Sequence, residues 1–488
     1  MTSSQTAAGI VLVLATMGPV GFAADGTLLD ETASGVVPVN QETLVLVRGI
    51  QGQVVLQPGA AAELEFRSTS PDKDDEEVPV GLWTDGEGFR LEPPRGHASV
   101  RARLTVSVPS GMKVRLELEH SAVTVMGLDN ELAVFGRQLQ FEAQGLRRSA
   151  QFEIEGGAVK VHVAGKGVRI RGRDLDVVVD GIAGRADVKL TGGTARLNGL
   201  QSGLQGDFTG TNVAIDTVSD AVSLHFVNGR AEVARLRDGG DIALTGCKLG
   251  LEQIGGALSI TSDSAVKFSD CKASLRIENS AGSVTGVKND GVLDVTTHNA
   301  QVALGQMRGQ VRVAGDTLDV RLQQIDATVG VLTTSSSVAL DVSTAPVTIE
   351  NDGGDVVVKH TEAQVDVKSR GGNVHLVKIR GPVTVQADGE LVEAEWEVLT
   401  SAADSKIVNE GGGVTVRFPP AGDIRVDATS RSGRVESSLA KLIVAEDRGS
   451  AKGFAGDGGQ DLKTLVIKAA GDIDLQGSNG ADPAGQAP

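Results

Sequence analysis

The segment VTIENDGGDVVVKHTEAQVDVKSRGGNVHL, residues 347–376, decides the fold. An apolar residue, a variable residue and a second apolar residue recur every nine positions in it, starting at Val347, Val356, Val365 and Val374. Side chains alternate across a strand, so each triplet reads as a short strand with one buried face. The residues between triplets are rich in Gly, Asn, Asp and Ser, which favour turns.

The same period runs in both directions from this segment, from Val114 to Val392, with one slip of a residue between Leu258 and Val266. Only a repeated short strand accounts for a period held over this length. Helical spacing is absent, and β-branched residues dominate the triplets. The sequence therefore predicts an all-β repeat protein.

Two arrangements of the strands fit this period. An antiparallel meander would use nine residues per strand and turn, whereas a parallel solenoid would use about 18 residues and two short strands per coil. In a solenoid, residues 18 apart stack about 4.8 Å from one another. Opposite charges then fall on adjacent rungs, which is favourable, at Arg276, Asp294 and Arg312, at Glu350 and Lys368, and at Asp341 and Lys359. We predict a parallel β-solenoid, a β-helix or β-roll.

The regularity of the period predicts the domain organisation. The regular solenoid is expected over residues 114–394. Bare end rungs aggregate unless they are covered, so the irregular strand patterns of residues 40–113 and 395–476 are expected to be capping coils. Residues 477–488 are expected to be a disordered tail.

The N-terminus has the features of an export signal. Residues 7–24 are uncharged and mostly apolar, with Ile10–Leu14 at the centre and Gly21-Phe22-Ala23 near the end. We predict a signal peptide over residues 1–24 and export to the periplasm, the outer cell surface or the extracellular space. No Lys or Arg precedes the apolar run, which leaves open a start further upstream. No later segment has the roughly 20 apolar residues that span a bilayer.

The net charge bears on which partners the protein can bind, and the cysteine content bears on whether it contains a disulfide. The formal net charge of −17 argues against binding to nucleic acid or to an anionic membrane, although it also simply favours solubility. Cys247 and Cys271 are the two cysteines. A disulfide is common in exported proteins, but the period places this pair on opposite edges of a coil. We expect two free thiols packed as small apolar residues.

The residues that carry chemistry do not form a recognisable site. Gly353-Gly354-Asp355 and Gly371-Gly372-Asn373 resemble calcium-binding rolls but lack the second Gly-x-Asp half, and the acidic loop 71–77 lacks spaced calcium ligands. The histidines show no metal-ligand spacing; they are His97, His120, His162, His225, His298, His360 and His375. We therefore predict no catalytic, cofactor-binding or metal-binding residue.

An enzyme is the principal alternative, because polysaccharide lyases and hydrolases also use parallel β-helices. The many Asp and Glu residues would permit a pair of catalytic carboxylates. The short coils and brief turns argue against a cleft, and the chain has two Trp and no Tyr to stack on sugar rings. We predict that the protein is not an enzyme.

The strands at the two ends of the period carry a family resemblance. Leu104–Gly111 runs from a strand through Pro and Gly into the repeat, and Val414–Pro419 leads into Ile424–Val435. This pattern resembles the adhesin-like β-strand-repeat family of exported bacterial proteins, a domain of unknown function. The resemblance covers most of residues 40–476. It implies a right-handed parallel β-solenoid in the cell envelope, and it implies no catalytic residue.

Together these patterns favour a non-catalytic, exported structural or adhesin-like protein that presents a polar surface. The alternatives are a carbohydrate-active β-helix enzyme and an envelope assembly factor that binds a protein partner by its sheet edge. The partner is left open between a cell-surface glycan and an envelope protein.

Overall fold

The computed structural model describes residues 27–39, 43–60, 62–73, 75–84, 88–399, 403–420, 422–456 and 462–477. Within these residues the chain is an all-β parallel solenoid with about 18 residues per turn and no helix, which confirms the predicted fold class. The predicted signal peptide and residues 478–488 of the predicted tail lie outside the described residues. The chain divides into two compact units, Met1–Leu139 and Gln140–Pro488.

The first unit has two stacks of strands. One stack runs in the order β11, β9, β3, β7, β6, β1, and the other in the order β10, β4, β8, β5, β2. The pairs β1–β6, β6–β7, β2–β5 and β5–β8 are antiparallel, and the remaining pairs are parallel. Their bounds are β1 (Thr27–Thr32), β2 (Ser34–Pro38), β3 (Leu44–Arg48), β4 (Ile50–Pro58), β5 (Glu63–Thr69), β6 (Val80–Thr84), β7 (Gly88–Glu92), β8 (Val100–Val108), β9 (Lys113–Glu119), β10 (Ser121–Met126) and β11 (Glu131–Leu146).

The outermost strands of these two stacks are blunted against further pairing. The pairing of β1 shifts register between Leu28 and Asp30, which marks a bulge. Acidic Asp30 and Glu31 follow on the same strand, and β2 ends at Pro38. Charges, bulges and proline are the features that keep an edge strand from adding another strand.

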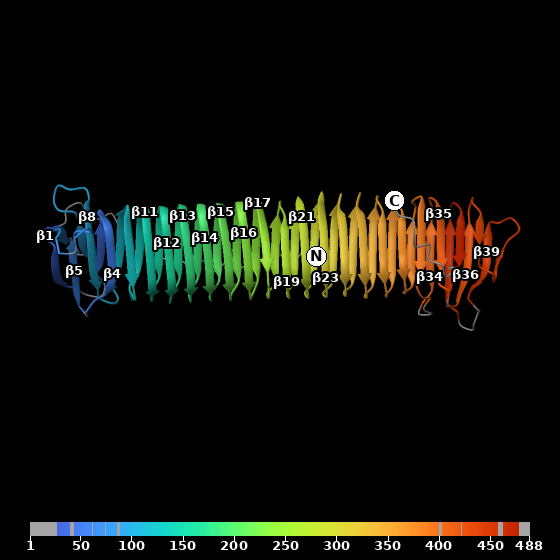
Figure 1. Ribbon diagram of the computed structural model, residues 1–488, viewed down its shortest axis with the longest axis horizontal. Helices are drawn as coiled ribbons and strands as arrows, with labels where there is room; N and C mark the ends of the chain where they lie inside the picture. Colours follow the sequence, from blue (N-terminus) through green and yellow to red (C-terminus); the bar gives the residue numbers. More distant parts are fainter. Residues whose placement is uncertain are drawn as a thin grey trace, which may run out of the picture. The chain divides into compact units, whose positions relative to one another are not determined.

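The first coils of the second unit are each a single bent strand (Figure 1). These strands are β12 (Ala150–Ala164), β13 (Val168–Ile182), β14 (Ala186–Leu200), β15 (Leu204–Val218), β16 (Val222–Leu236) and β17 (Gly240–Glu252). Each bends at a residue with left-handed backbone, such as Asp174, Gly192 or Asn228 (φ 50°, 76° and 53°). The prediction of two short strands per coil is therefore wrong here, because this bend leaves the hydrogen-bonded ladder nearly continuous.

After the slip, each coil does have two short strands. Leu249 pairs with Val266 and Leu258 with Leu275, a 17-residue step, and the 18-residue step then resumes. The strands are β18 (Leu258–Ser262), β19 (Val266–Cys271), β20 (Leu275–Asn279), β21 (Gly282–Asn289), β22 (Leu293–His298), β23 (Ala300–Met307), β24 (Val311–Asp316), β25 (Asp319–Ile325), β26 (Val329–Thr334), β27 (Ser337–Ser343), β28 (Val347–Asp352), β29 (Val356–Thr361), β30 (Val365–Arg370), β31 (Val374–Ile379), β32 (Val383–Ala387) and β33 (Leu391–Trp396).

The core of the second unit lies between the two rows of strands. Val329 and Val331 of β26 are buried, like the inward valines of neighbouring coils. Phe208 and Phe226 stack on adjacent coils with ring centroids 5.2 Å apart. One inward column is mostly polar from β18 onward, with Gly315 and Ala387 on two of its rungs. Its buried polar residues are Ser262, Asn279, Thr297, Thr333, Asn351, Ser369 and Asn409. The Asn351 amide donates to the backbone oxygens of Ser336 and Gly354, so it links the turn that follows its own strand to the backbone of the preceding coil.

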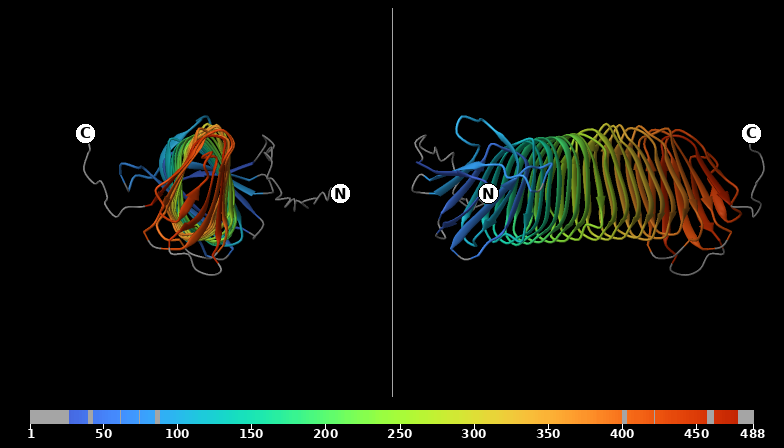
Figure 2. Two further views of the ribbon diagram at one scale, coloured as in Figure 1. Left: turned by 90° about the vertical axis from the view of Figure 1, so that its right-hand side faces the viewer. Right: turned by 60° about the vertical axis from the view of Figure 1, so that its left-hand side comes forward.

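The C-terminal strands return into the stack instead of extending it. β40 (Thr464–Ala469) lies between β34 (Ser405–Asn409) and β36 (Ile424–Ser430). Likewise, β41 (Ile473–Gly477) lies between β35 (Gly413–Phe418) and β37 (Val435–Ser437). Antiparallel strands β39 (Ser450–Ala455) and β38 (Leu442–Val444) continue from β36. Figure 2 shows these C-terminal strands in orange and red at one end of the second unit. The outermost strands β37 and β38 have three residues each, which leaves little edge to pair.

A valine in the left-handed region offers a test of the corner geometry. Val163 has φ 58°, whereas Gly181 and Gly199 hold the equivalent place on the next two coils. The left-handed conformation costs an L-residue about 1–2 kcal/mol. Glycine avoids this strain, but its greater conformational entropy in the unfolded chain offsets about 0.5–1 kcal/mol of the gain. We expect Val163→Gly to raise the free energy of unfolding by about 0.5–1 kcal/mol in urea denaturation. Gly181→Val should lower it, and equal midpoints for both variants would contradict the strain.

Candidate functional site

The outward side chains of the second unit stack in columns, as the charge pattern predicted. Arg276, Asp294 and Arg312 occupy successive rungs, as do Glu350 and Lys368, whose Oε1 and Nζ atoms are 2.7 Å apart. Arg276 instead forms its ion pair with Glu278 on its own strand, at 2.7 Å. The predicted stacking is thus confirmed. The charge pattern predicts the ion pair between Glu350 and Lys368, but not the pairing of Arg276 within its own strand.

Several histidines contact a carboxylate on a neighbouring coil. His360 Nδ1 lies 2.8 Å from Asp341 Oδ1, and His375 Nδ1 lies 3.0 Å from Glu393 Oε2. His298 pairs with Asp316 in the same way. The sequence signal for these pairs is an acidic residue 18 or 19 positions from a histidine. The sequence analysis compared only the spacing between histidines and therefore missed these pairs. Among the described residues, no cluster of three or more His, Cys, Asp or Glu side chains is arranged to hold a metal ion.

The Gly-Gly turns that resemble calcium rolls are linked from coil to coil by protein groups. Asp355 Oδ1 accepts a hydrogen bond from the backbone N–H of Asn373 at 2.9 Å. Asn373 Oδ1 accepts in turn from the N–H of Leu391 at 3.1 Å. These side chains satisfy the amides of the next turn, which supports their interpretation as turn residues.

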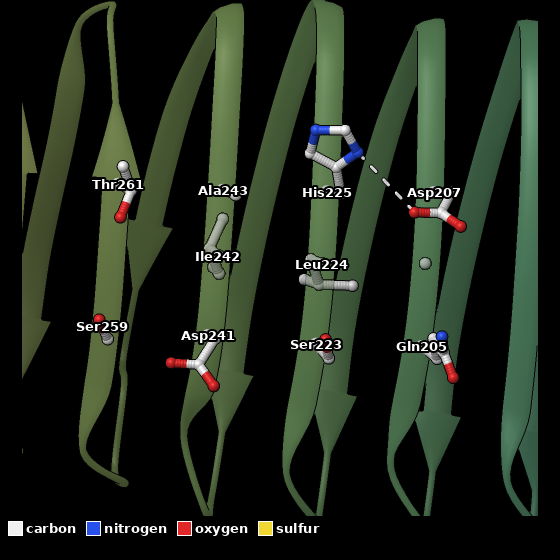
Figure 3. Close-up of a pocket in the computed structure, with 11 residues that line it drawn as sticks. Gln205, Asp207, Ser223, Leu224, His225, Asp241, Ile242, Ala243, Ser259 and Thr261 are labelled. Atoms are coloured by element: carbon white, nitrogen blue, oxygen red, sulfur yellow. Dashed lines mark ion pairs between the residues drawn. The ribbon is translucent and has the colours of Figure 1, made fainter. Parts of the chain in front are cut away.

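A shallow depression of about 250 Å³ lies on the outer face of β15 to β18 (Figure 3). It is lined by small side chains, including Ser223, Ala243 and Ser259, and by His225, whose Nδ1 lies 3.8 Å from Asp207 Oδ1. Ser223, His225 and Asp207 are the residue types of a nucleophilic triad. However, the backbone amides of these strands are paired in the ladder, so they are not directed at a developing oxyanion.

The carboxylates of this depression are also poorly placed for glycoside hydrolysis. Asp207 and Asp241 are separated by two rungs and by two positions along the strand. Rung and strand spacings put their Cα atoms about 12 Å apart. Retaining and inverting hydrolases hold their carboxyl groups about 5–9.5 Å apart, so this face does not favour either mechanism.

A longer groove of about 550 Å³ follows one corner of the coils from β19 to β27, and we call it the corner groove. Its first rail is formed by Asp270, Lys288, Gln306, Gln324 and Val342, and its second rail by Lys272, Asp290, Arg308 and Asp326. Polar contacts run along each rail. Lys288 Nζ lies 3.4 Å from Asp270 Oδ1, and the Gln306 amide donates to Gln324 Oε1 at 3.2 Å. On the second rail, Arg308 lies 4.0 Å from Asp290.

The two cysteines are free and buried, as the sequence predicted. Burial raises the pKa of both the Cys247 and the Cys271 thiol. A raised pKa keeps the thiol protonated at higher pH than usual, and the thiolate is the reactive form. We expect iodoacetamide at pH 8 to label the native protein far more slowly than the protein unfolded in guanidinium, measured by mass spectrometry. Rapid labelling of the native chain would contradict this packing.

Within the part of the chain that the structure describes, no helix has the length and apolar character to cross a membrane. A scan of protein-family models finds no match to the chain, and no curated protein and no solved structure matches it.

Proposed function

We propose that this chain is a non-catalytic, exported cell-envelope protein, structural or adhesin-like, that acts through the polar surface of its coils. One observation carries the proposal: outward polar side chains stack in register from coil to coil, as at Glu350 and Lys368. Such a surface presents outward side chains at a regular spacing over many coils, which suits several weak contacts with a repetitive partner. In the depression near His225, the backbone amides are paired in the ladder and the carboxylates are widely spaced, which supports a non-catalytic surface.

Membership of the adhesin-like β-strand-repeat family is part of the same proposal. The solenoid fold agrees with what that resemblance implies, and Leu104–Val108, Val414–Phe418 and Ile424–Ser430 are strands. Blunted outer strands, such as β1 with its bulge and the short β38, favour surface display over pairing with a partner by a sheet edge.

Export and surface binding can be tested together. The full chain with a C-terminal tag would be produced in a bacterial host, fractionated, and sequenced at its N-terminus. We expect the mature protein outside the cytoplasm, cleaved near Ala24, and retained on envelope preparations. A Leu12→Arg, Leu14→Arg control should stay in the cytoplasm, because it interrupts the apolar run. Cytoplasmic retention of the wild type, or no binding to envelopes, would refute the proposal.

A further inference from the structure

We propose that the corner groove binds a linear, uncharged polysaccharide that lies along the stacking direction of β19 to β27. This inference rests on the proposed function and adds to it a site and a ligand class. The groove spans successive coils, and its volume of about 550 Å³ lies in the range of ligand sites.

The groove arises from the backbone at the corner. On each coil, a residue with left-handed backbone points outward, the next residue points into the core, and the one after it points outward again. Gln306, Met307 and Arg308 illustrate this order, with φ 57° at Gln306 and a fully buried Met307. The two outward side chains form the two rails, and the pattern repeats at the rung spacing of about 4.8 Å. A polymer with a short, regular repeat can therefore meet an outward side chain at the equivalent position of each successive coil.

The first rail keeps side chains where glycine would be less strained. Lys288, Gln306 and Gln324 have φ 56°, 57° and 54°, and Asp270 and Val342 share this conformation. Glycine holds the equivalent place at Gly181 and Gly199, whereas Thr217, Arg235 and His360, which do not line the groove, share the left-handed conformation. The conformation is therefore a feature of this corner in general, and within the groove it directs the side chains of the first rail outward.

The charges of the rails argue against a polyanionic or polycationic ligand. Lys288 is paired with Asp270, and Arg308 lies beside Asp290. Asp326 accepts a hydrogen bond from Thr344 at 3.1 Å. The second rail alternates in sign, and the first rail carries one acid and one base followed by uncharged residues. The charges of the groove therefore cancel and create little net field to attract a charged polymer.

The backbone of the floor argues against an extended peptide. The amides of Asp290, Arg308 and Asp326 donate to the oxygens of Cys271, Asn289 and Met307 at 2.8–2.9 Å, so the main chain at the floor is already paired. Extended peptides bind through free main-chain groups and apolar pockets. The rails offer amide, carboxylate and guanidinium groups instead, which donate to and accept from hydroxyl groups. Each sugar would gain little alone, but contacts repeated along the groove add up.

The test uses the mature full-length chain and uncharged linear hexasaccharides, namely β-1,4-linked glucose, α-1,4-linked glucose and β-1,4-linked N-acetylglucosamine. Binding is measured by calorimetry and ligand-observed NMR. We expect at least one of them to bind, and Gln306→Ala, Gln324→Ala to weaken it at least tenfold. Gln323→Ala is the matched control, because Gln323 is exposed on the same strand but does not line the groove. It should leave the affinity unchanged. Gln324→Gly should weaken binding while keeping or raising the melting temperature, which separates ligand loss from misfolding.

The same assay includes hexagalacturonate and an extended Ser-Thr-Val decapeptide as competing ligand classes. Binding of either one alone, or no binding of any hexasaccharide, would overturn the proposed ligand. Equal effects of Gln323→Ala and Gln324→Ala would overturn the site. If the Gln306→Ala, Gln324→Ala variant still binds envelopes as well as the wild type, the groove inference fails while the proposed function stands.

Discussion

Replacing Val329 by aspartate is expected to destabilise the second unit by more than about 3 kcal/mol, because a carboxyl group would be buried without a partner. Val329 is 1% exposed and pairs with Val311 on one side and Val347 on the other, both of them buried. A solenoid coil is stabilised by contacts with its neighbours, so the variant should weaken two interfaces. Urea denaturation followed by circular dichroism would show a lower midpoint, with an early transition from the coils around β26.

The pH dependence of this variant follows from the same burial. The pKa of the introduced carboxyl group should lie above its unfolded value of about 3.9, since burial disfavours the charged form. The destabilisation should therefore be largest at neutral pH and shrink as the pH falls through the folded pKa. Thr348→Asn is the control: Thr348 is exposed on the next coil, and its substitution should change stability by less than about 0.5 kcal/mol. Similar midpoints for the two variants would mean that Val329 is not in the core.

The predictable part of the fold is what the period determines locally. Two apolar residues with one position between them fix which face of each strand is buried, as in Val365-Asp366-Val367. The 18-residue step then follows from charge pairs such as Glu350 and Lys368. A period does not reveal whether a turn interrupts the hydrogen-bonded ladder, and for this reason the bent strands β12 to β17 were predicted as separate strands.

The burial of polar residues inside the coils could not be predicted from the sequence pattern either. Asn279 and Asn351 resemble turn residues in the sequence, yet both are buried at the corner. Their orientation depends on the strand continuing at least two residues beyond the apolar triplet before it bends. The insertion of β40 beside β34 is a long-range crossover, which no local pattern encodes.

The grooves were unpredictable for a different reason. The corner groove depends on which residues adopt left-handed backbone, and Gln306 and Gln324 are not residue types that favour this conformation. The depression near His225 depends on side-chain sizes compared across adjacent coils. To predict either groove, one must know which residues of successive coils lie side by side. This requires the pairing register of the strands, including the one-residue slip.

The pair Phe268 and Gly286 offers a second large effect, because the two residues share one space in the core. They lie opposite each other on adjacent rungs, and a Cβ atom on Gly286 would be 1.9 Å from Cζ of Phe268. We expect Gly286→Leu to destabilise the protein by about 3 kcal/mol through overpacking. Phe268→Leu should cost about 1–2 kcal/mol, because it leaves space over Gly286.

The double variant separates this shared space from two independent packing defects. Leu304 and Leu322 continue the same buried column on the next coils. Phe268→Leu combined with Gly286→Leu would extend that column of leucines, so we expect the double variant to be more stable than Gly286→Leu alone. The coupling energy should be about 2 kcal/mol in urea denaturation. Additive effects would mean that the ring of Phe268 does not fill the space above Gly286, and that the register of β19 against β21 is different from the one described.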